Sequence, residues 1–199
     1  RLRLLEEFGE EQGELYSCEL ATGFPPGYRD DFDPRVAVMD IKHFLCLQQG
    51  AEMDLDFYRQ DVEGEVEGNL RLRLYHGDSS VPLSDVLPIL ENLGLRVLTE
   101  RPYAIRTRDG KLYWVHEFSL VYTLSQGIVI AEVKDEFETA FARIWTGEAE
   151  NDCFNRLLLG TRLSWREIAV LRAFARYLRQ LRFPYSVDYV AETLANHLD

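Results

Sequence analysis

Two pairs of segments in which apolar residues alternate with polar ones limit the folds open to this chain. The apolar positions of the first pair are Met53, Leu55 and Phe57, followed by Leu70, Leu72 and Leu74. A period of two places such residues on one face of a strand. The interval between the two segments is acidic, with Glu63, Glu65 and Glu67 beside Gly64 and Gly68. The pattern therefore predicts a hairpin with an acidic turn.

The second pair predicts another hairpin, over about 96–106 and 111–123. Its two segments meet at Asp109-Gly110, which is a strong hairpin signal. A helix with apolar residues at Val86, Leu90 and Leu93 separates the hairpins, and another over about 132–146 follows the second. We expect Ser84 to cap the first of these helices and Gly94 to end it.

The resulting order of elements is β-β-α-β-β-α. A ferredoxin-like fold runs β-α-β-β-α-β, and its last strand lies antiparallel beside its first. Here the extra strand comes first and forms a hairpin with the next strand, so it can occupy the same sheet edge. The sequence therefore predicts an α+β fold: a circularly permuted ferredoxin-like antiparallel sheet with two helices on one face.

Helical patterns flank this core on both sides. The first covers residues 1–22, and the second begins at Asp33-Pro34, a capping residue followed by proline at the first helical position, and runs to Gly50. After Gly147 the chain is helical again. Ser164-Trp-Arg-Glu has the form of a capping box, and the helix that it opens runs to about Arg182. Ser186 is then expected to cap a last helix.

Three parts are predicted from these boundaries: an N-terminal helical segment at 1–50, an α+β domain at 51–147 and a C-terminal helical segment at 148–199. Arg1 rather than Met opens the sequence, and a helical pattern reaches each end. We therefore expect a segment of a larger protein.

No apolar run approaches the roughly 20 residues that a membrane-spanning helix needs. Three widely spaced cysteines without a CxxC pair favour a reducing cytoplasm.

The net charge of −12 is concentrated near the start of the chain. Residues 1–68 hold 17 acidic and 6 basic side chains. Such a surface repels nucleic acid, so we expect no nucleic-acid partner. Since no apolar run is long enough to span a membrane, we expect no membrane partner either.

The sequence lacks the motifs of the common catalytic and nucleotide sites. It has no GxGxxG or GxxxxGK[ST] turn and no GxSxG elbow. Asp30, Asp31 and Asp33 are interpreted as a helix cap and a solvated turn, because a calcium loop needs a glycine and a bidentate glutamate that are missing. The pair His43 and Cys46 has no second pair of ligands with which to hold a metal. We therefore predict no catalytic, cofactor-binding or metal-binding residue in this chain.

Two further features favour ordinary structural roles. His116 lies on the apolar face of its strand, which favours a hydrogen-bonded core histidine. Glu148, Glu150 and Asp152 lie between helices, which favours a solvated connector that also caps a helix.

Four arginines form a basic stripe along the long C-terminal helix: Arg172, Arg176, Arg179 and Arg182. We interpret the stripe as a contact surface for an acidic protein, with the chain's own first third as one candidate, or equally as a solvated face. An arginine-rich helix next to a break also fits helix-turn-helix DNA binding, but the acidity of the chain disfavours that alternative.

Several stretches of the sequence resemble the large bacterial NAD-dependent glutamate dehydrogenases. These are 28–34, 81–103, 147–158, 163–180 and 183–186. The resemblance implies a parent chain several times longer, with a C-terminal catalytic domain that uses NAD to oxidise L-glutamate to 2-oxoglutarate and ammonia. None of the catalytic motifs of that domain matches this sequence. The family's N-terminal part contains ACT-like modules and helical segments thought to serve regulation and assembly, so 51–147 resembles one ACT-like module.

The resemblance therefore implies a non-catalytic regulatory or structural segment of a homo-oligomeric enzyme. Its partners would be other domains of its own chain and neighbouring subunits. The alternative is an amino-acid sensor, because ACT-like modules often bind amino acids at the loop after the first core strand. In this sequence the candidate effector loop consists of Gly77, Asp78 and Ser79 with Ser84 and Asp85. Exposed backbone N–H groups at that helix start could take a carboxylate.

Overall fold

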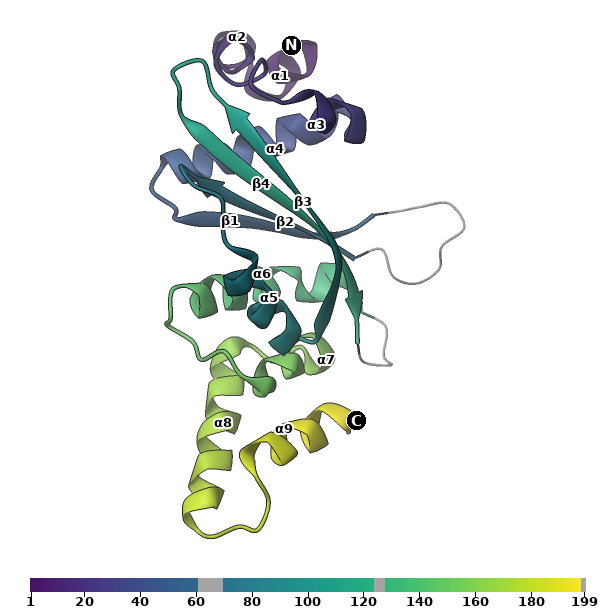
Figure 1. Cartoon of the computed structure of the whole chain (residues 1–199), viewed down its shortest axis with the longest axis vertical. Coiled ribbons are helices and arrows are strands. Elements are labelled where there is room, and N and C mark those ends of the chain that lie inside the picture. The colour runs from purple at the N-terminus through teal and green to yellow at the C-terminus, as the bar shows by residue number, and fades with distance from the viewer. Residues whose placement is uncertain (61–69, 124–127, 198–199) are drawn as a thin grey trace. The chain divides into compact units, whose positions relative to one another are not determined.

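A computed structural model describes residues 1–60, 70–123 and 128–197. Its sheet has four strands in the order β1-β2-β4-β3 (Figure 1). The strands are β1 (Met53–Arg59), β2 (Leu70–Gly77), β3 (Leu95–Arg106) and β4 (Leu112–Tyr122). The first strand lies at the edge beside β2, which is the place that the last strand takes in a ferredoxin-like sheet. The predicted α+β fold with a permuted antiparallel sheet is confirmed.

Helix α5 (Leu83–Asn92) lies between β2 and β3 in the chain, and helix α6 (Ile130–Trp145) follows β4. The remaining helices before the sheet are α1 (Leu2–Phe8), α2 (Glu10–Glu19), α3 (Pro26–Asp31) and α4 (Pro34–Gln48). Those after α6 are the 3₁₀ turn η1 (Cys153–Arg156), α7 (Leu157–Thr161), α8 (Trp165–Gln180) and α9 (Val187–Asn196). The sequence did not predict α3, η1 or α7. The predicted acidic turn at Glu63, Glu65 and Glu67 falls outside the described residues.

Most of the predicted caps are present. Asp33 accepts a hydrogen bond from the backbone N–H of Arg35 at 2.8 Å, and Ser186 accepts one from Tyr189 at 3.0 Å. The predicted cap at Ser84 is wrong, because Pro82 occupies the N-cap position and provides no side-chain acceptor. Proline fixes the extended backbone just before the helix. Helix α5 therefore starts at Leu83, and the hydroxyl of Ser84 donates to the Asp85 carboxylate at 3.2 Å.

The predicted single helix over 1–22 is also wrong, because the chain breaks it into α1 and α2. Gly9 lies at the break with φ of 80°, a conformation that costs other residues free energy. Gly13 then allows α2 to lie close to α1, since a Cβ at Gly13 would come within 2.5 Å of the carbonyl oxygen of Leu4. The break lets two short helices pack side by side, which a local helical pattern cannot reveal.

The chain divides into two compact units, and each strand contributes residues to both. The first unit comprises 1–56, 72–81 and 100–118, and the second comprises 57–71, 82–99 and 119–199. The parts predicted at 1–50, 51–147 and 148–199 follow a different division, and those boundaries stay predictions.

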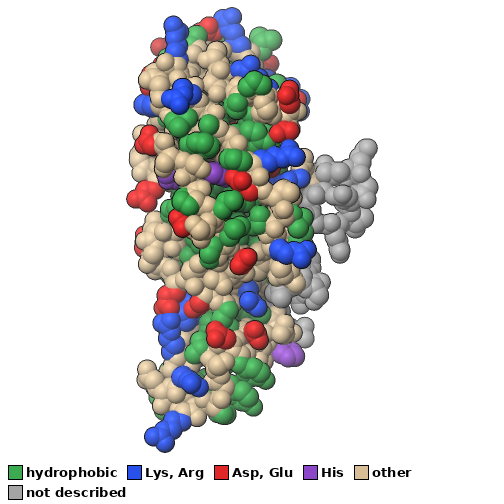
Figure 2. All heavy atoms as spheres, in the orientation of Figure 1, with side chains coloured by type: hydrophobic (Ala, Val, Ile, Leu, Met, Phe, Trp, Pro, Cys, Tyr) green, Lys and Arg blue, Asp and Glu red, His purple; other side chains and the backbone are tan. Residues whose placement is uncertain are grey.

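Acidic residues of the first unit are partly neutralised within it. The guanidinium of Arg1 pairs with Glu14 at 2.8 Å, and Lys42 pairs with Glu7. On the face that Figure 2 shows, acidic and basic side chains are interspersed at the end of the molecule that holds α1 and α2. The acidic excess of the sequence therefore does not form one continuous surface on this face.

The core of the first unit contains a buried carboxylate, Asp40 of α4, with no exposed surface. It accepts hydrogen bonds from the hydroxyls of Tyr28 and Tyr75, the latter at 2.8 Å. Arg73 of β2 donates to it at 2.8 Å and also donates to Glu117 of β4 at 2.6 Å. Burial, and then the charge of Asp40, raises the pKa of both tyrosines, so the hydroxyls stay protonated as donors.

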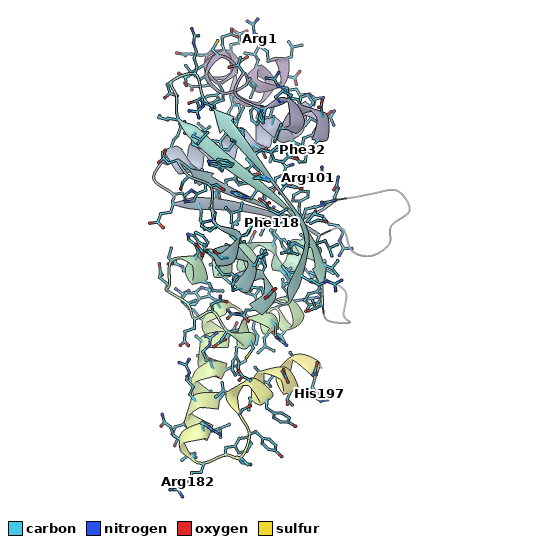
Figure 3. All side chains as sticks on the ribbon, viewed as in Figure 1. Arg1, Phe32, Arg101, Phe118, Arg182 and His197 are labelled. Carbon is cyan, nitrogen blue, oxygen red and sulfur yellow. The ribbon has the colours of Figure 1, made fainter. Side chains whose placement is uncertain are left out.

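This network joins α4 to the two central strands of the sheet. Phe32, which is labelled in Figure 3, contributes a ring to this cluster. The ring lies over the guanidinium of Arg73, with its centroid 4.3 Å from Cζ, and covers one side of that charge. Removing two charges from water costs free energy, and a buried ion pair offsets this cost only when further hydrogen bonds and contacts surround both charges. The position of α4 on the sheet therefore depends on Asp40.

We predict that Asp40→Asn lowers the free energy of unfolding by about 3–5 kcal/mol, the range for breaking a buried ion pair. The amide keeps the shape of the carboxylate but loses its charge next to Arg73. Urea unfolding of the 199-residue chain measures the effect. Asp30→Asn, at an exposed position in α3, is the matched control and should change stability by less than about 0.5 kcal/mol. Equal effects of the two substitutions would contradict the role given to Asp40.

Candidate functional site

The candidate site is a junction in the second unit, where the loop after α6 meets α8. Helix α8 begins with the predicted capping box: Ser164 accepts from the backbone N–H of Glu167 at 3.4 Å, and Glu167 accepts from that of Ser164 at 2.8 Å. The helix buries Ile168, Arg172 and Ala175. These positions are four and three residues apart and so share one face. That face carries a charged residue in an otherwise apolar row.

The loop facing this row is held by its own hydrogen bonds. Asp152 caps η1 by accepting from the backbone N–H of Phe154 at 3.1 Å. The side chain of Asn155 donates to the backbone carbonyl of Glu150 at 2.9 Å. Residues 150–155 are thus fixed in place, with two polar side chains available to α8.

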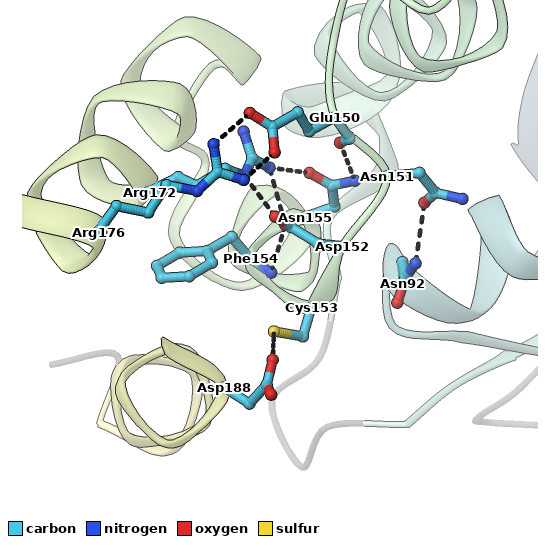
Figure 4. A network of polar contacts seen from close by, with 10 residues as sticks. All are labelled: Asn92, Glu150, Asn151, Asp152, Cys153, Phe154, Asn155, Arg172, Arg176 and Asp188. Carbon is cyan, nitrogen blue, oxygen red and sulfur yellow. Dashed lines mark hydrogen bonds and ion pairs between the residues drawn. The ribbon is translucent and has the colours of Figure 1, made fainter. Parts of the chain in front are cut away.

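Arg172 binds both of these side chains (Figure 4). Its Nε donates to Asp152 Oδ2 at 2.6 Å, and its Nη2 donates to Asp152 Oδ1 at 2.9 Å and to Asn155 Oδ1 at 2.8 Å. The arginine side chain is 4% exposed and that of Asp152 is 29% exposed. A bidentate pair of this kind fixes direction as well as distance. We call Arg172, Asp152 and Asn155 the arginine junction.

Two more contacts connect the same loop to neighbouring helices. Asn92, the last residue of α5, donates to the side chain of Asn151 at 2.9 Å. The thiol of Cys153 lies 3.3 Å from the carboxylate of Asp188 in α9. Burial, assisted by Asp188, raises the pKa of Cys153 to about 11, so this thiol is protonated near neutral pH. The loop therefore contacts α5, α8 and α9, and Cys153 is no activated nucleophile.

The four arginines predicted as one stripe occupy different environments. Arg172 is buried in the junction, and Arg176 forms an exposed pair with Glu150 at 2.8 Å. Arg179 and Arg182 are exposed, and Arg182 follows the end of α8 with φ of 62°. The acidic partner of the first two is the loop at 150–152, for which the sequence predicted a solvated connector. Asp152 was predicted there as part of the connector with its cap, and it does cap η1, whereas Asn155 and Asn92 were not singled out in the sequence.

The candidate effector loop is distributed over both units. Gly77, Asp78 and Ser79 belong to the first unit, whereas Ser84 and Asp85 belong to the second. The backbone N–H of Asp78 donates to Leu112 at 2.8 Å, and that of Ser79 donates to Gly77 at 2.7 Å. Both N–H groups are thus already bound within the chain.

The histidines singled out in the sequence have structural partners. His116 is buried, as predicted, and its Nδ1 lies 2.7 Å from Glu100. The Nδ1 of His43 lies 2.8 Å from Asp54, and its ring stacks on Tyr75 with centroids 4.1 Å apart. In the ranges that the structure describes, no three His, Cys, Asp or Glu side chains are placed to hold a metal ion. No helix within those ranges is long and apolar enough to cross a membrane.

We predict that Arg172→Ala lowers the free energy of unfolding by about 2–3 kcal/mol, because Asp152 loses a charged hydrogen-bond partner but can still reach water. Arg176→Ala is the matched control on the same helix. Its exposed pair with Glu150 is worth about 0–1 kcal/mol. Urea unfolding measures both. If the two variants lost equal stability, the junction would be no stronger than a surface ion pair.

Family models of one enzyme match successive parts of the chain. The model described as glutamate dehydrogenase, helical motif 2 matches residues 3–47. The ACT3 domain of glutamate dehydrogenase matches 52–133, and its helical motif 3 matches 149–199. The permuted sheet and α5 thus lie within the ACT3 match, and the arginine junction lies within the helical motif 3 match.

Curated relatives agree with these matches. A protein from Halomonas elongata is 48% identical over 193 residues, and one from Pseudomonas aeruginosa is 43% identical over 196. A protein from Mycobacterium tuberculosis is 32% identical over 190 residues. All three are named NAD-specific glutamate dehydrogenase, and the matches cover 93–98% of this chain. The chain spans about 12% of the length of the first two relatives. It belongs to the family of NAD-specific glutamate dehydrogenases.

Proposed function

We propose that the chain is a non-catalytic regulatory or structural segment of a cytoplasmic NAD-dependent glutamate dehydrogenase. The parent reaction converts L-glutamate, NAD and water to 2-oxoglutarate, ammonia and NADH. The observation that carries the proposal is the match of ACT3 and two helical motifs over nearly the whole chain, which spans only about 12% of the first two relatives. In this proposal the segment consists of an N-terminal helical part at 1–50, an ACT-like domain at 51–147 and a C-terminal helical part at 148–199.

An NAD site does not fit the described residues. Dinucleotide sites form at the carboxyl ends of parallel strands, where a glycine-rich turn leads into a helix. The sheet here is antiparallel in the order β1-β2-β4-β3. Pro82 precedes α5, where a backbone N–H would otherwise be available to a phosphate. The proposal therefore assigns NAD to another part of the parent enzyme.

The role we propose for the arginine junction is mechanical coupling. Helix α5 of the ACT-like part and helices α8 and α9 belong to the same compact unit. The loop at 150–155 contacts all three, through Asn151, Arg172 and Asp188. In this proposal the loop is the route by which a displacement of α5 would reach α8.

The first test of this proposal is a direct assay of the 199-residue chain. We expect no NADH when the chain is mixed with L-glutamate and NAD, because the proposal places the hydride-transfer site in another part of the parent enzyme. Absorbance of NADH measures the reaction, and the full-length enzyme is the positive control. Glutamate-dependent NADH formation by the chain alone would overturn the proposal.

Amino-acid sensing at the candidate effector loop is the alternative. Two observations weigh against it: the N–H groups of Asp78 and Ser79 are already bound, and Asp85 places a carboxylate in the first turn of α5. A second carboxylate at that helix start would be repelled.

We accordingly predict that calorimetry of the 199-residue chain with each common amino acid gives no saturable heat. The matched variant is Asp85→Asn, which removes the repelling charge and shows whether a latent site exists. A saturable heat with the unmodified chain, lost in Ser84→Ala, would establish the sensor alternative instead.

A further inference from the structure

The first unit contains an apolar cavity that the proposed function does not use. Its volume is about 570 Å³, and small-molecule sites measure roughly 300–1,000 Å³. Helices α1, α3 and α4 surround it, and all three belong to the first unit (Figure 1). Its buried lining residues are Leu4, Phe24, Tyr28 and Ile41. These walls suit the apolar part of a ligand.

Helix α4 contributes one continuous apolar face to the cavity. Pro34, Ala37, Val38 and Ile41 line it, and their spacing of three, one and three residues places them on one side of the helix. Ile41 is buried, whereas Ala37 and Val38 are only half-buried. A ligand in the cavity would remove the remaining apolar surface from water, which favours binding.

The charged residues that line the cavity are arginines: Arg1, Arg3 and Arg29. Residues 1–56 hold 13 acidic and 5 basic side chains. Three of the five basic side chains line the cavity, but none of the acidic ones is among the described residues that line it. Positive charge is therefore gathered at this cavity in a part of the chain that is otherwise acidic.

The three arginines differ in their partners. The guanidinium of Arg1 is bound to Glu14 at 2.8 Å, and that of Arg29 reaches only the backbone carbonyl of Thr22 at 3.4 Å. Arg3 is half-buried, and the described part of the chain gives its side chain no hydrogen bond or ion pair. Taking part of a guanidinium out of water costs free energy unless a partner compensates. An anion in the cavity would supply that partner.

The acidic residues closest to these arginines in the sequence do not take that place. Glu7 of α1 is paired with Lys42. Asp31 accepts a hydrogen bond from Tyr103 at 2.5 Å, and Asp33 caps α4. Glu6 and Asp30 are exposed, and neither lines the cavity. They weaken the attraction of the arginines for an anion but leave Arg3 without a partner.

We propose that this cavity binds a small amphiphilic anion, an acyl chain with a carboxylate head group. The chain packs on the apolar face of α4, and the carboxylate binds Arg3. A free amino acid fits less well, because no acid among the described lining residues pairs with its ammonium group. The inference goes beyond the proposed function and does not depend on it.

Calorimetric titration of the 199-residue chain with decanoate tests the proposal. We expect saturable binding at least about tenfold tighter than that of decanol, which has the same chain without the charge. Arg3→Glu should weaken the binding of decanoate at least about tenfold. Arg35→Glu is the matched control, because Arg35 is an exposed arginine of α4 that does not line the cavity. It should change the affinity by less than about twofold, since a distant surface charge is screened.

A cavity-filling variant tests the location. Ala37→Phe places a ring in the cavity and should abolish the binding of both probes, while circular dichroism checks that the variant remains folded. Binding that survives Ala37→Phe, or no saturable heat with decanoate, would overturn the site. Equal affinities for decanoate and decanol would overturn the role of Arg3. Binding to the chain but not to the full-length dehydrogenase would overturn the ligand in favour of another part of the polypeptide. None of these readouts uses activity, so they are independent of the glutamate assay.

Discussion

A buried charge must be paired, and each unit of this chain is organised around one arginine that meets this requirement. Arg73 lies between Asp40 and Glu117 in the first unit, and Arg172 is held by Asp152 and Asn155 in the second. Both arginines connect elements far apart in sequence. A buried ion pair adds little net stability compared with apolar packing, because desolvation offsets the attraction. Its main effect is to exclude every arrangement in which the charge would be left alone.

Local patterns predicted the sheet and most caps, because those signals are set by neighbouring residues. Alternation gave the four strands, Asp109-Gly110 marked a turn, and Ser164 opened a capping box. The two failures have different causes. Gly9 breaks the first helix so that Gly13 can pack against Leu4, a contact between two helices that no helical pattern contains. The error at Ser84 is local, because Pro82, two residues earlier, takes the N-cap position and starts the helix at Leu83.

The arginine junction was visible in the sequence only in part. Arginines at three- and four-residue spacing predicted a common stripe, yet folding buries Arg172 and leaves Arg179 exposed. One signal was available: Arg172 lies four residues after Ile168 and three before Ala175, on the apolar face of its own helix. An arginine on that face implies a polar partner inside the fold. The identity of that partner depends on how the loop at 150–155 folds back onto α8, which the sequence does not encode locally.

The two faces of α8 together explain why an arginine is useful at position 172. Apolar side chains alone tolerate small rotations of a helix, since dispersion contacts have little direction. The bidentate contacts of Arg172 with Asp152 allow far less rotation. Fixing the inner face also fixes where Phe174 and Tyr177 point, because all three residues belong to one rigid helix. The direction of the exposed apolar side chains of α8 is therefore set by a buried polar contact on the opposite side of the helix.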